Sequence, residues 1–60
     1  MKPTVRLSGT DGNAFAIMSK VTWALKRAGM EKEAEEFSKE ARKGDYDHLL
    51  QTVMKYVEVE

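Results

Sequence analysis

The chain has 60 residues, no cysteine, one proline and a formal net charge of zero, because ten basic side chains balance ten acidic ones. This length allows one small domain, which we expect to span residues 1–60 around a core of limited size. The missing cysteines exclude disulfides, thiol nucleophiles and cysteine-ligated metal sites, the apolar content excludes a disordered chain, and no apolar run approaches the roughly 20 residues of a membrane span.

The first predicted element is a strand over residues 4–8, where polar and apolar residues alternate. Val5 and Leu7 share one side of such a strand and would face the core. Residues 8–13 are rich in glycine, aspartate and asparagine, which predicts a turn. No alternating segment follows the turn, so we expect the chain to continue as a helix and not as a hairpin.

A helix is predicted over residues 14–28, where the apolar residues fall in one arc of about 120° at 100° per residue. Asn13 or Asp11 is the expected N-cap. Gly29 follows at the position where a left-handed C-terminal residue is favoured. The residues of the apolar arc are Ala14, Ile17, Met18, Val21, Ala24, Leu25 and Ala28.

A second helix is predicted over residues 30–43, ending before Gly44. Its apolar stripe is narrow and consists of Met30, Ala34, Phe37 and Ala41. The other positions are mostly charged, so we expect this helix to lie on the outside and to contact the core mainly through Phe37.

A third helix is predicted after Asp45, whose side chain would cap it. Helical spacing gives it an inward face of Tyr46, Leu49, Leu50, Val53 and Met54. Residues 56–60 alternate again and predict a closing strand, with Val57 and Val59 facing inward.

These elements predict an α+β domain of order β-α-α-α-β. Three helices that reverse direction between the strands would leave the strands parallel, in a minimal two-stranded sheet covered on one face by helices. Arg6 on the first strand would then pair with a glutamate of the last strand, either Glu58 or Glu60. Both edges of such a sheet are open, so self-association through a strand edge is one way in which the chain would find a partner.

The charged residues are divided unevenly between the halves of the chain. Residues 1–30 contain five basic side chains and one acidic one, whereas residues 31–60 contain nine acidic and five basic ones. Because no sign dominates, general nucleic-acid binding is not favoured. The division would orient the encounter with a partner, although acids that solvate one helix explain it more simply. No apolar stretch follows Lys2, so we expect a cytoplasmic protein without a secretory signal or membrane association.

Three segments carry a resemblance to known proteins: residues 9–15 (GTDGNAF), 44–50 (GDYDHLL) and 56–59 (YVEV). In these segments, and over essentially its full length, the chain resembles a family of short uncharacterised proteins from bacteria and their phages. The resemblance implies a stand-alone domain of bacterial or phage origin and no particular chemistry.

The turn before the first helix is one candidate site. Backbone N–H groups at Gly9, Gly12 and Asn13 would cradle an anion at the start of the helix. However, the segment matches neither the phosphate-loop nor the dinucleotide pattern, and it lacks a lysine. Asp11 would also repel an anion, so a turn that caps the helix is the stronger interpretation.

Trp23 is the strongest functional candidate. It lies at 180° from the centre of the apolar arc, with Lys20 and Arg27 beside it. A tryptophan flanked by cations would stack on a nucleobase or anchor a protein contact. The alternative is that the indole folds over the protein's own surface while its N–H reaches water.

Asp45, Asp47 and His48 form a third candidate cluster. Two carboxylates and an imidazole are able to bind a metal or transfer protons. The acids stand where a helix start favours them, and His48 is the only histidine, so the structural interpretation is stronger.

We therefore expect a small, non-catalytic interaction or regulatory protein that has no cofactor or metal and binds a protein partner through Trp23, Lys20 and Arg27. One histidine, no cysteine and a 60-residue scaffold leave little from which to build a preorganised catalytic site. The alternatives are a nucleic-acid-binding module that uses the same side of the first helix and an anion-binding loop protein.

Overall fold

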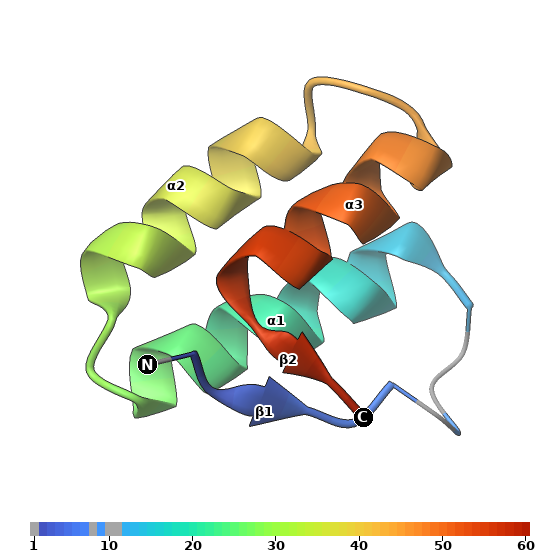
Figure 1. Cartoon of the computed structure of the whole chain (residues 1–60). Helices are drawn as coiled ribbons and strands as arrows, with labels where there is room; N and C mark the ends of the chain where they lie inside the picture. Colours follow the sequence, from blue (N-terminus) through green and yellow to red (C-terminus); the bar gives the residue numbers. More distant parts are fainter. Residues whose placement is uncertain (1, 8, 10–11) are drawn as a thin grey trace.

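The computed structural model describes residues 2–7, 9 and 12–60. Two short strands, one before and one after three helices in the sequence, lie side by side in space (Figure 1). Their order is β1 (Thr4–Val5), α1 (Ala14–Arg27), α2 (Glu31–Ala41), α3 (Tyr46–Tyr56) and β2 (Glu58–Val59). The strands pair in parallel, with Thr4 opposite Glu58 and Val5 opposite Val59. This arrangement confirms the predicted α+β fold of order β-α-α-α-β, in which β1 contacts α1 and β2 contacts α3.

Backbone hydrogen bonds join the two strands over only a few residues. The N–H of Glu58 donates to the carbonyl of Pro3 at 2.9 Å, and the N–H of Glu60 donates to the carbonyl of Val5 at 2.8 Å. Beyond the strands, the N–H of Leu7 donates to the Glu60 carbonyl at 3.3 Å. The sheet is therefore shorter than the strands predicted over residues 4–8 and 56–60.

The last strand is short because α3 runs further than its sequence pattern indicated. α3 ends at Tyr56, and Val57 caps it by donating its N–H to the carbonyl of Val53 at 3.0 Å. Val57 is 1% exposed and belongs to the core, whereas Val59 is 45% exposed. The prediction that both valines face inward is wrong for Val59. The predicted cross-strand ion pair does form, between Arg6 and Glu60 at 3.7 Å.

The helix ends follow their local capping signals. The Asn13 side chain caps α1, and the Asp45 side chain caps α3 by accepting the N–H of His48 at 3.0 Å. Gly29, with a φ of +79°, takes the left-handed conformation that favours glycine after a helix. α1 ends one residue before its predicted end, and α2 is shorter than residues 30–43 because Met30 and Arg42 are its caps.

The core lies where the three helices meet. Phe37 is completely buried at its centre, together with Leu25 and Leu49, which are at most 2% exposed. The ring of Tyr56 packs edge-on against Phe37, with the ring centres 5.7 Å apart. The narrow stripe of α2 is buried as predicted, through Ala34, Phe37 and Ala41.

The predicted inward face of α3 is confirmed for Leu49, Leu50 and Val53, which pack in or against the core, and is wrong for Tyr46 and Met54. Its buried residues are Leu49, Thr52 and Val53, whereas Tyr46 and Met54 are 45% and 58% exposed. Thr52 enters the core without an unsatisfied hydroxyl, because its Oγ1 donates to the carbonyl of His48 at 2.7 Å. A pattern read from apolar residues alone omits this threonine, and for that reason it turned the helix toward Tyr46 and Met54.

Tyr56 lies at the edge of the core beside the acidic side of α2. Burial of its phenol raises the pKa of Tyr56, and the negative charges of Glu36, Glu40 and Glu33 raise it further.

None of the helices in the described part of the chain is both long enough and apolar enough to cross a membrane.

Candidate functional site

The outer side of α1 carries an exposed tryptophan. Trp23 is 61% exposed, on the opposite side of the helix from Val21 and Leu25, which are completely buried. One turn later, the guanidinium carbon of Arg27 lies 4.7 Å from the centre of the indole ring. Such a cation–π contact contributes about 0.5–1 kcal/mol at an exposed site, so it holds the indole in place without burying it. The exposure predicted for Trp23 is confirmed.

Of the three residues predicted to bind a partner, the structure brings two into contact. Trp23 and Arg27 stack on each other. Lys20, one turn before Trp23, is also exposed on α1. Whether these residues bind a partner stays a prediction.

Phe15 is exposed on the same helix, and to a greater extent than Trp23. Its exposed fraction is 75%, and it precedes Trp23 by eight residues, with Ser19 halfway between them. Spacing of i, i+4 and i+8 places all three on one side of a helix. α1 therefore has two apolar sides, one buried in the core and one carrying exposed aromatic rings.

Two hollows adjoin along this side. The first has a volume of about 330 Å³ and lies between α1 and the C-terminal part of α2; its walls are Phe15, Met18, Ser19, Thr22, Trp23, Lys26, Ser38 and Arg42. The second has a volume of about 250 Å³ and a mainly apolar lining, which includes Phe15, Met18 and Arg42 again, together with Ala41, Tyr46 and Leu49. Because the two hollows share three side chains, we call them together the α1–α2 groove.

A further hollow flanks Trp23 on its other side. It has a volume of about 350 Å³ and lies between the C-terminal end of α1 and the start of β1, where Pro3 and Thr4 line it. The indole of Trp23 and the side chain of Arg27 form its opposite wall. Trp23 therefore stands between two depressions of the surface.

The charges around the α1–α2 groove are mostly positive. α1 contains Lys20, Lys26 and Arg27 and no acidic residue. Within the described ranges, neither Lys26 nor Arg42 forms an ion pair. Among the described residues, one acidic side chain lines the groove, that of Asp45, which caps α3. An approaching group would therefore meet exposed aromatic rings together with Lys26 and Arg42, which form no ion pair with the described residues.

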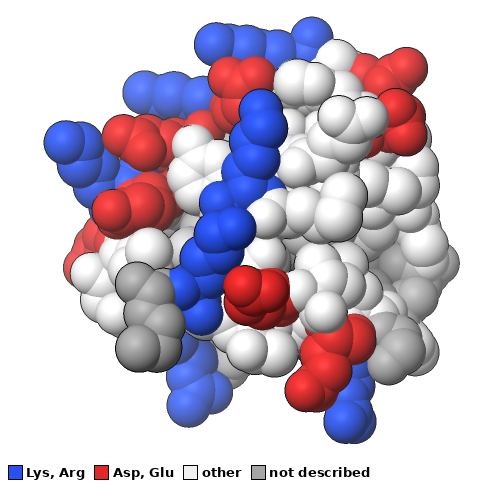
Figure 2. Space-filling model, viewed as in Figure 1, with Lys and Arg blue, Asp and Glu red and all other residues white. Residues whose placement is uncertain are grey.

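A different charge pattern covers the face seen in Figure 1. Acidic and basic side chains both lie over the side of α2, and neutral side chains cover much of the middle and right of the face, with acidic side chains again at its upper right (Figure 2). Mixed signs of this kind are typical of a solvated surface. The uneven division of charge along the sequence therefore does not produce a single strong field on this face.

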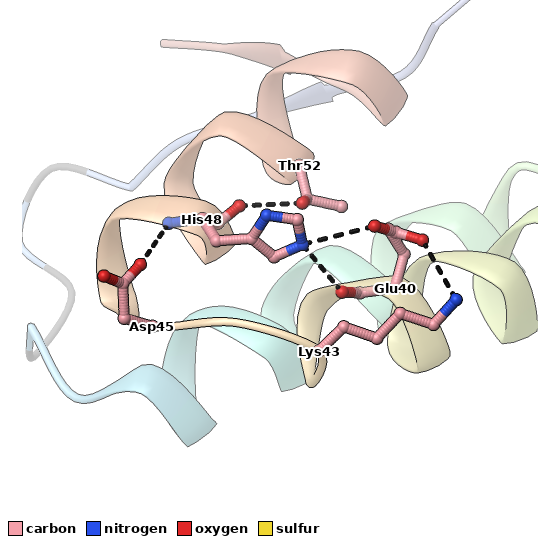
Figure 3. Close-up of polar contacts among 5 residues, drawn as sticks. All are labelled: Glu40, Lys43, Asp45, His48 and Thr52. Atoms are coloured by element: carbon pink, nitrogen blue, oxygen red, sulfur yellow. Dashed lines mark hydrogen bonds and ion pairs between the residues drawn. The ribbon is translucent and has the colours of Figure 1, made fainter.

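The side chains of Asp45, Asp47 and His48 each form a hydrogen bond near the start of α3, and Figure 3 shows those of Asp45 and His48. Asp45 caps α3, and Asp47 accepts a hydrogen bond from Gln51 at 3.1 Å. The Nε2 atom of His48 lies 3.0 Å from the Glu40 carbonyl and 3.2 Å from the Glu40 carboxylate, so His48 links α3 to the end of α2. Among residues 2–7, 9 and 12–60, no three histidine, cysteine or acidic side chains are grouped so that they could hold a metal ion.

Asn13, at the end of the loop before α1, caps the helix. The Asn13 side chain accepts the N–H groups of Phe15 at 2.8 Å and Ala16 at 3.4 Å, and the Asn13 carbonyl accepts that of Ile17 at 3.1 Å. Gly9, with a φ of +82°, and Gly12 are exposed, and the Asp11 considered as a cap lies outside the described residues. The bonds to Asn13 occupy the first N–H groups of α1, but they do not involve the N–H groups of Gly9, Gly12 and Asn13, so the anion-binding alternative stays a prediction.

Sequence reasoning missed Phe15, Lys26 and Arg42 as parts of this surface. A signal for Phe15 was present, because a second set of residues at i, i+4 and i+8 ends at Trp23. No comparable signal existed for Arg42, whose position beside Phe15 depends on how α2 packs against α1.

Comparison of the chain with protein-family models, with curated proteins and with solved structures found no match. The resemblance to short bacterial and phage proteins therefore stays a prediction, and a function must be argued from the chain's own residues.

Proposed function

We propose that this chain is a small, non-catalytic binding protein that presents the outer side of α1 to another protein. The observation that carries the proposal is Trp23, which is 61% exposed, stacked on Arg27 and placed between two surface hollows. Tryptophan and arginine are enriched among the residues that dominate the free energy of protein binding. A large exposed ring beside a depression offers apolar area that a bound partner would remove from water.

The remaining chemistry of the chain supports binding more than catalysis. The single histidine contacts Glu40 instead of facing the α1–α2 groove. The phenol with a raised pKa, Tyr56, packs against Phe37 at the edge of the core. Neither His48 nor Tyr56 is among the described residues that line the groove, and the Asp45 carboxylate that does line it accepts the His48 N–H as the cap of α3.

The proposal is tested by photo-crosslinking in the cells that naturally make the chain. A benzophenone side chain placed at Ser19, between the two exposed rings of α1, should crosslink to another protein. The same group at Gln51, which is exposed on α3, should not give that product. Equal products at both positions would refute the placement of the interface.

Two truncations of similarly exposed side chains supply the matched control. Trp23 is 61% exposed and Met54 is 58% exposed, but only Trp23 lines a hollow of α1. Trp23→Ala should therefore abolish the crosslink at position 19, whereas Met54→Ala should leave it unchanged.

Nucleic-acid binding through the same side of α1 is the second candidate function. It is favoured by the absence of acidic residues from α1 and by the exposed rings of Phe15 and Trp23, on which bases would stack. This candidate predicts binding of mixed single-stranded DNA or RNA that weakens steeply as salt is added. Absence of binding at low salt would remove it.

Self-association through a strand edge is the weaker alternative. β1 and β2 are two residues long, so each edge offers few backbone groups to a further strand. Sedimentation equilibrium over a wide concentration range would reveal a dimer if one forms by this route.

A further inference from the structure

We propose that the partner segment recognised by the α1–α2 groove is an acidic amphipathic helix. The inference rests on the proposed function and adds to it the charge and the secondary structure of the partner. Three features of the groove carry the argument: its position between two helices, its apolar lining and the sign of its charges.

The groove has the geometry of a helix-packing site. α1 and α2 lie side by side and are joined by a short connection (Figure 1). α3 packs against both helices from one side, while the walls of the 330 Å³ hollow come from α1, α2 and the C-cap of α2. A groove between two neighbouring helices accepts the side-chain ridge of a third helix.

The length and lining of the groove fit the apolar side of such a helix. Phe15 and Trp23 are eight residues apart on α1, which corresponds to about 12 Å along the helix axis, or a little more than two turns. Phe15 stands where the 330 Å³ and 250 Å³ hollows adjoin, so each hollow takes a different side chain of the partner. Apolar residues at i, i+3 or i+4, and i+7 of one helix have this spacing.

The charges select an acidic partner. Lys26 and Arg42 line the groove and have no ionic partner in the described part of the chain. Arg27 adds a third cation beside Trp23, and Asp45 is the one acid among the described residues of the lining. Carboxylates beside the apolar stripe of the partner helix would pair with these cations, whereas a basic helix would be repelled.

A designed peptide tests the inference directly. The probe is a helix of about 14 residues with leucine at the i, i+3, i+7 and i+10 positions and glutamate or alanine elsewhere. Two controls keep its length: a scrambled peptide of identical composition without the apolar stripe, and a peptide with lysine in place of glutamate. A single-stranded oligonucleotide of mixed sequence is the fourth ligand.

Trp23 itself reports binding, because it is the only tryptophan in the chain and the peptides contain none. The acidic amphipathic peptide should shift the indole emission to shorter wavelength and reduce its quenching by acrylamide, in a saturable manner that weakens with salt. The inference is overturned if the scrambled or lysine peptide binds equally well, if no peptide binds, or if only the oligonucleotide does.

A pair of charge reversals on the same helical segment locates the site. Arg42→Glu should weaken binding of the acidic peptide about tenfold. Lys32→Glu makes the same change in charge at an exposed position near the other end of α2 and should leave affinity unchanged. Arg42→Gln, which removes the charge without placing an acid at the end of α2, should give an intermediate loss. Equal losses for Arg42→Glu and Lys32→Glu would contradict the assignment.

The peptide experiment and the crosslinking experiment distinguish an error in the partner's chemistry from an error in the proposed function. If a benzophenone at Ser19 crosslinks to a protein but the acidic peptide does not bind, the surface is correct and the stated chemistry of its partner is wrong. If neither result is obtained, both proposals are wrong.

Discussion

The two phenylalanines of the chain allow a direct comparison between a residue that supports the fold and one that does not. Phe15 is 75% exposed on the outer side of α1, and Phe37 is completely buried between the helices. The same substitution, phenylalanine to alanine, should therefore have very different effects on the free energy of unfolding.

The expected magnitudes follow from the buried areas. A phenylalanine side chain buries about 200 Å² in full, so Phe15 covers roughly a quarter of that, or ~50 Å², worth about 1.2 kcal/mol at 25 cal/mol per Å². Alanine is the better helix former by about 0.5 kcal/mol, so Phe15→Ala should cost less than about 1 kcal/mol. Phe37→Ala removes a completely buried ring and should cost about 3–5 kcal/mol.

Urea denaturation followed by circular dichroism at the helix band measures both changes. A domain of this size has a total stability of only about 3–9 kcal/mol, so Phe37→Ala is expected to leave much of the chain unfolded. Phe37→Leu, which should cost about 1–2 kcal/mol, keeps the comparison measurable. A loss for Phe15→Ala equal to or larger than that for Phe37→Leu would refute the reasoning, because Phe15 would then be needed for the fold and the groove that it lines would be closed.

Two further predictions concern the ends of α3. A Cβ atom on Gly44 would lie 2.7 Å from the Cβ of His48, whereas one on Gly12 would lie 3.8 Å from the Tyr46 hydroxyl. Gly44→Ala should therefore lower the free energy of unfolding by about 1–3 kcal/mol, and Gly12→Ala should lower it little. Equal urea midpoints for the two variants would contradict this prediction. The pKa of Tyr56 is raised in the folded chain above its ordinary value of 10.0, so the unfolded chain loses the phenol proton at a lower pH than the folded chain does. The free energy of unfolding therefore falls as the pH rises above that value, and below it the contribution of Tyr56 to stability is retained in full. Tyr56→Phe should show a smaller decrease in melting temperature between pH 9 and 11 than the wild type.

Local signals in the sequence were sufficient for the number and order of the helices and for the starts of α1 and α3. Asn13, Asp45 and Gly29 act within one turn of themselves, through a side chain or a backbone conformation that the residue type determines. The parallel strands followed from the number of helices between them. Their lengths did not, because the end of α3 at Tyr56 depends on Val57 entering the core.

The buried face of α3 needed information that apolar periodicity lacks. Thr52 is 1% exposed because the His48 carbonyl accepts its hydroxyl proton within the same helix. A threonine satisfied in this way packs as a β-branched apolar residue of similar size. Tyr46 and Met54 lie toward solvent instead, and Tyr46 lines the candidate groove.

Part of the candidate site could be predicted from the sequence of one helix, and the rest depends on how the helices pack together. Trp23 and Arg27 lie one turn apart on the same helix. Their angles around the helix axis were therefore sufficient to predict that Trp23 is exposed and that Arg27 lies beside it. The groove depends on three elements, because Arg42 ends α2 and Tyr46 begins α3. Sequence spacing therefore indicated the residue at the centre of the surface but not the walls around it.

The exposed rings of α1 also bear on the stability of the whole chain. A 60-residue domain gains little free energy from its core, yet Phe15 and Trp23 contribute most of their area to solvent. A partner that binds only the folded chain stabilises it by about 2.7 kcal/mol at a concentration 100 times its dissociation constant. That amount is comparable to the burial of another core side chain. The apolar area left outside the core would thus stabilise the fold once it is covered, and the unfolding temperature of the chain should rise with the concentration of its partner.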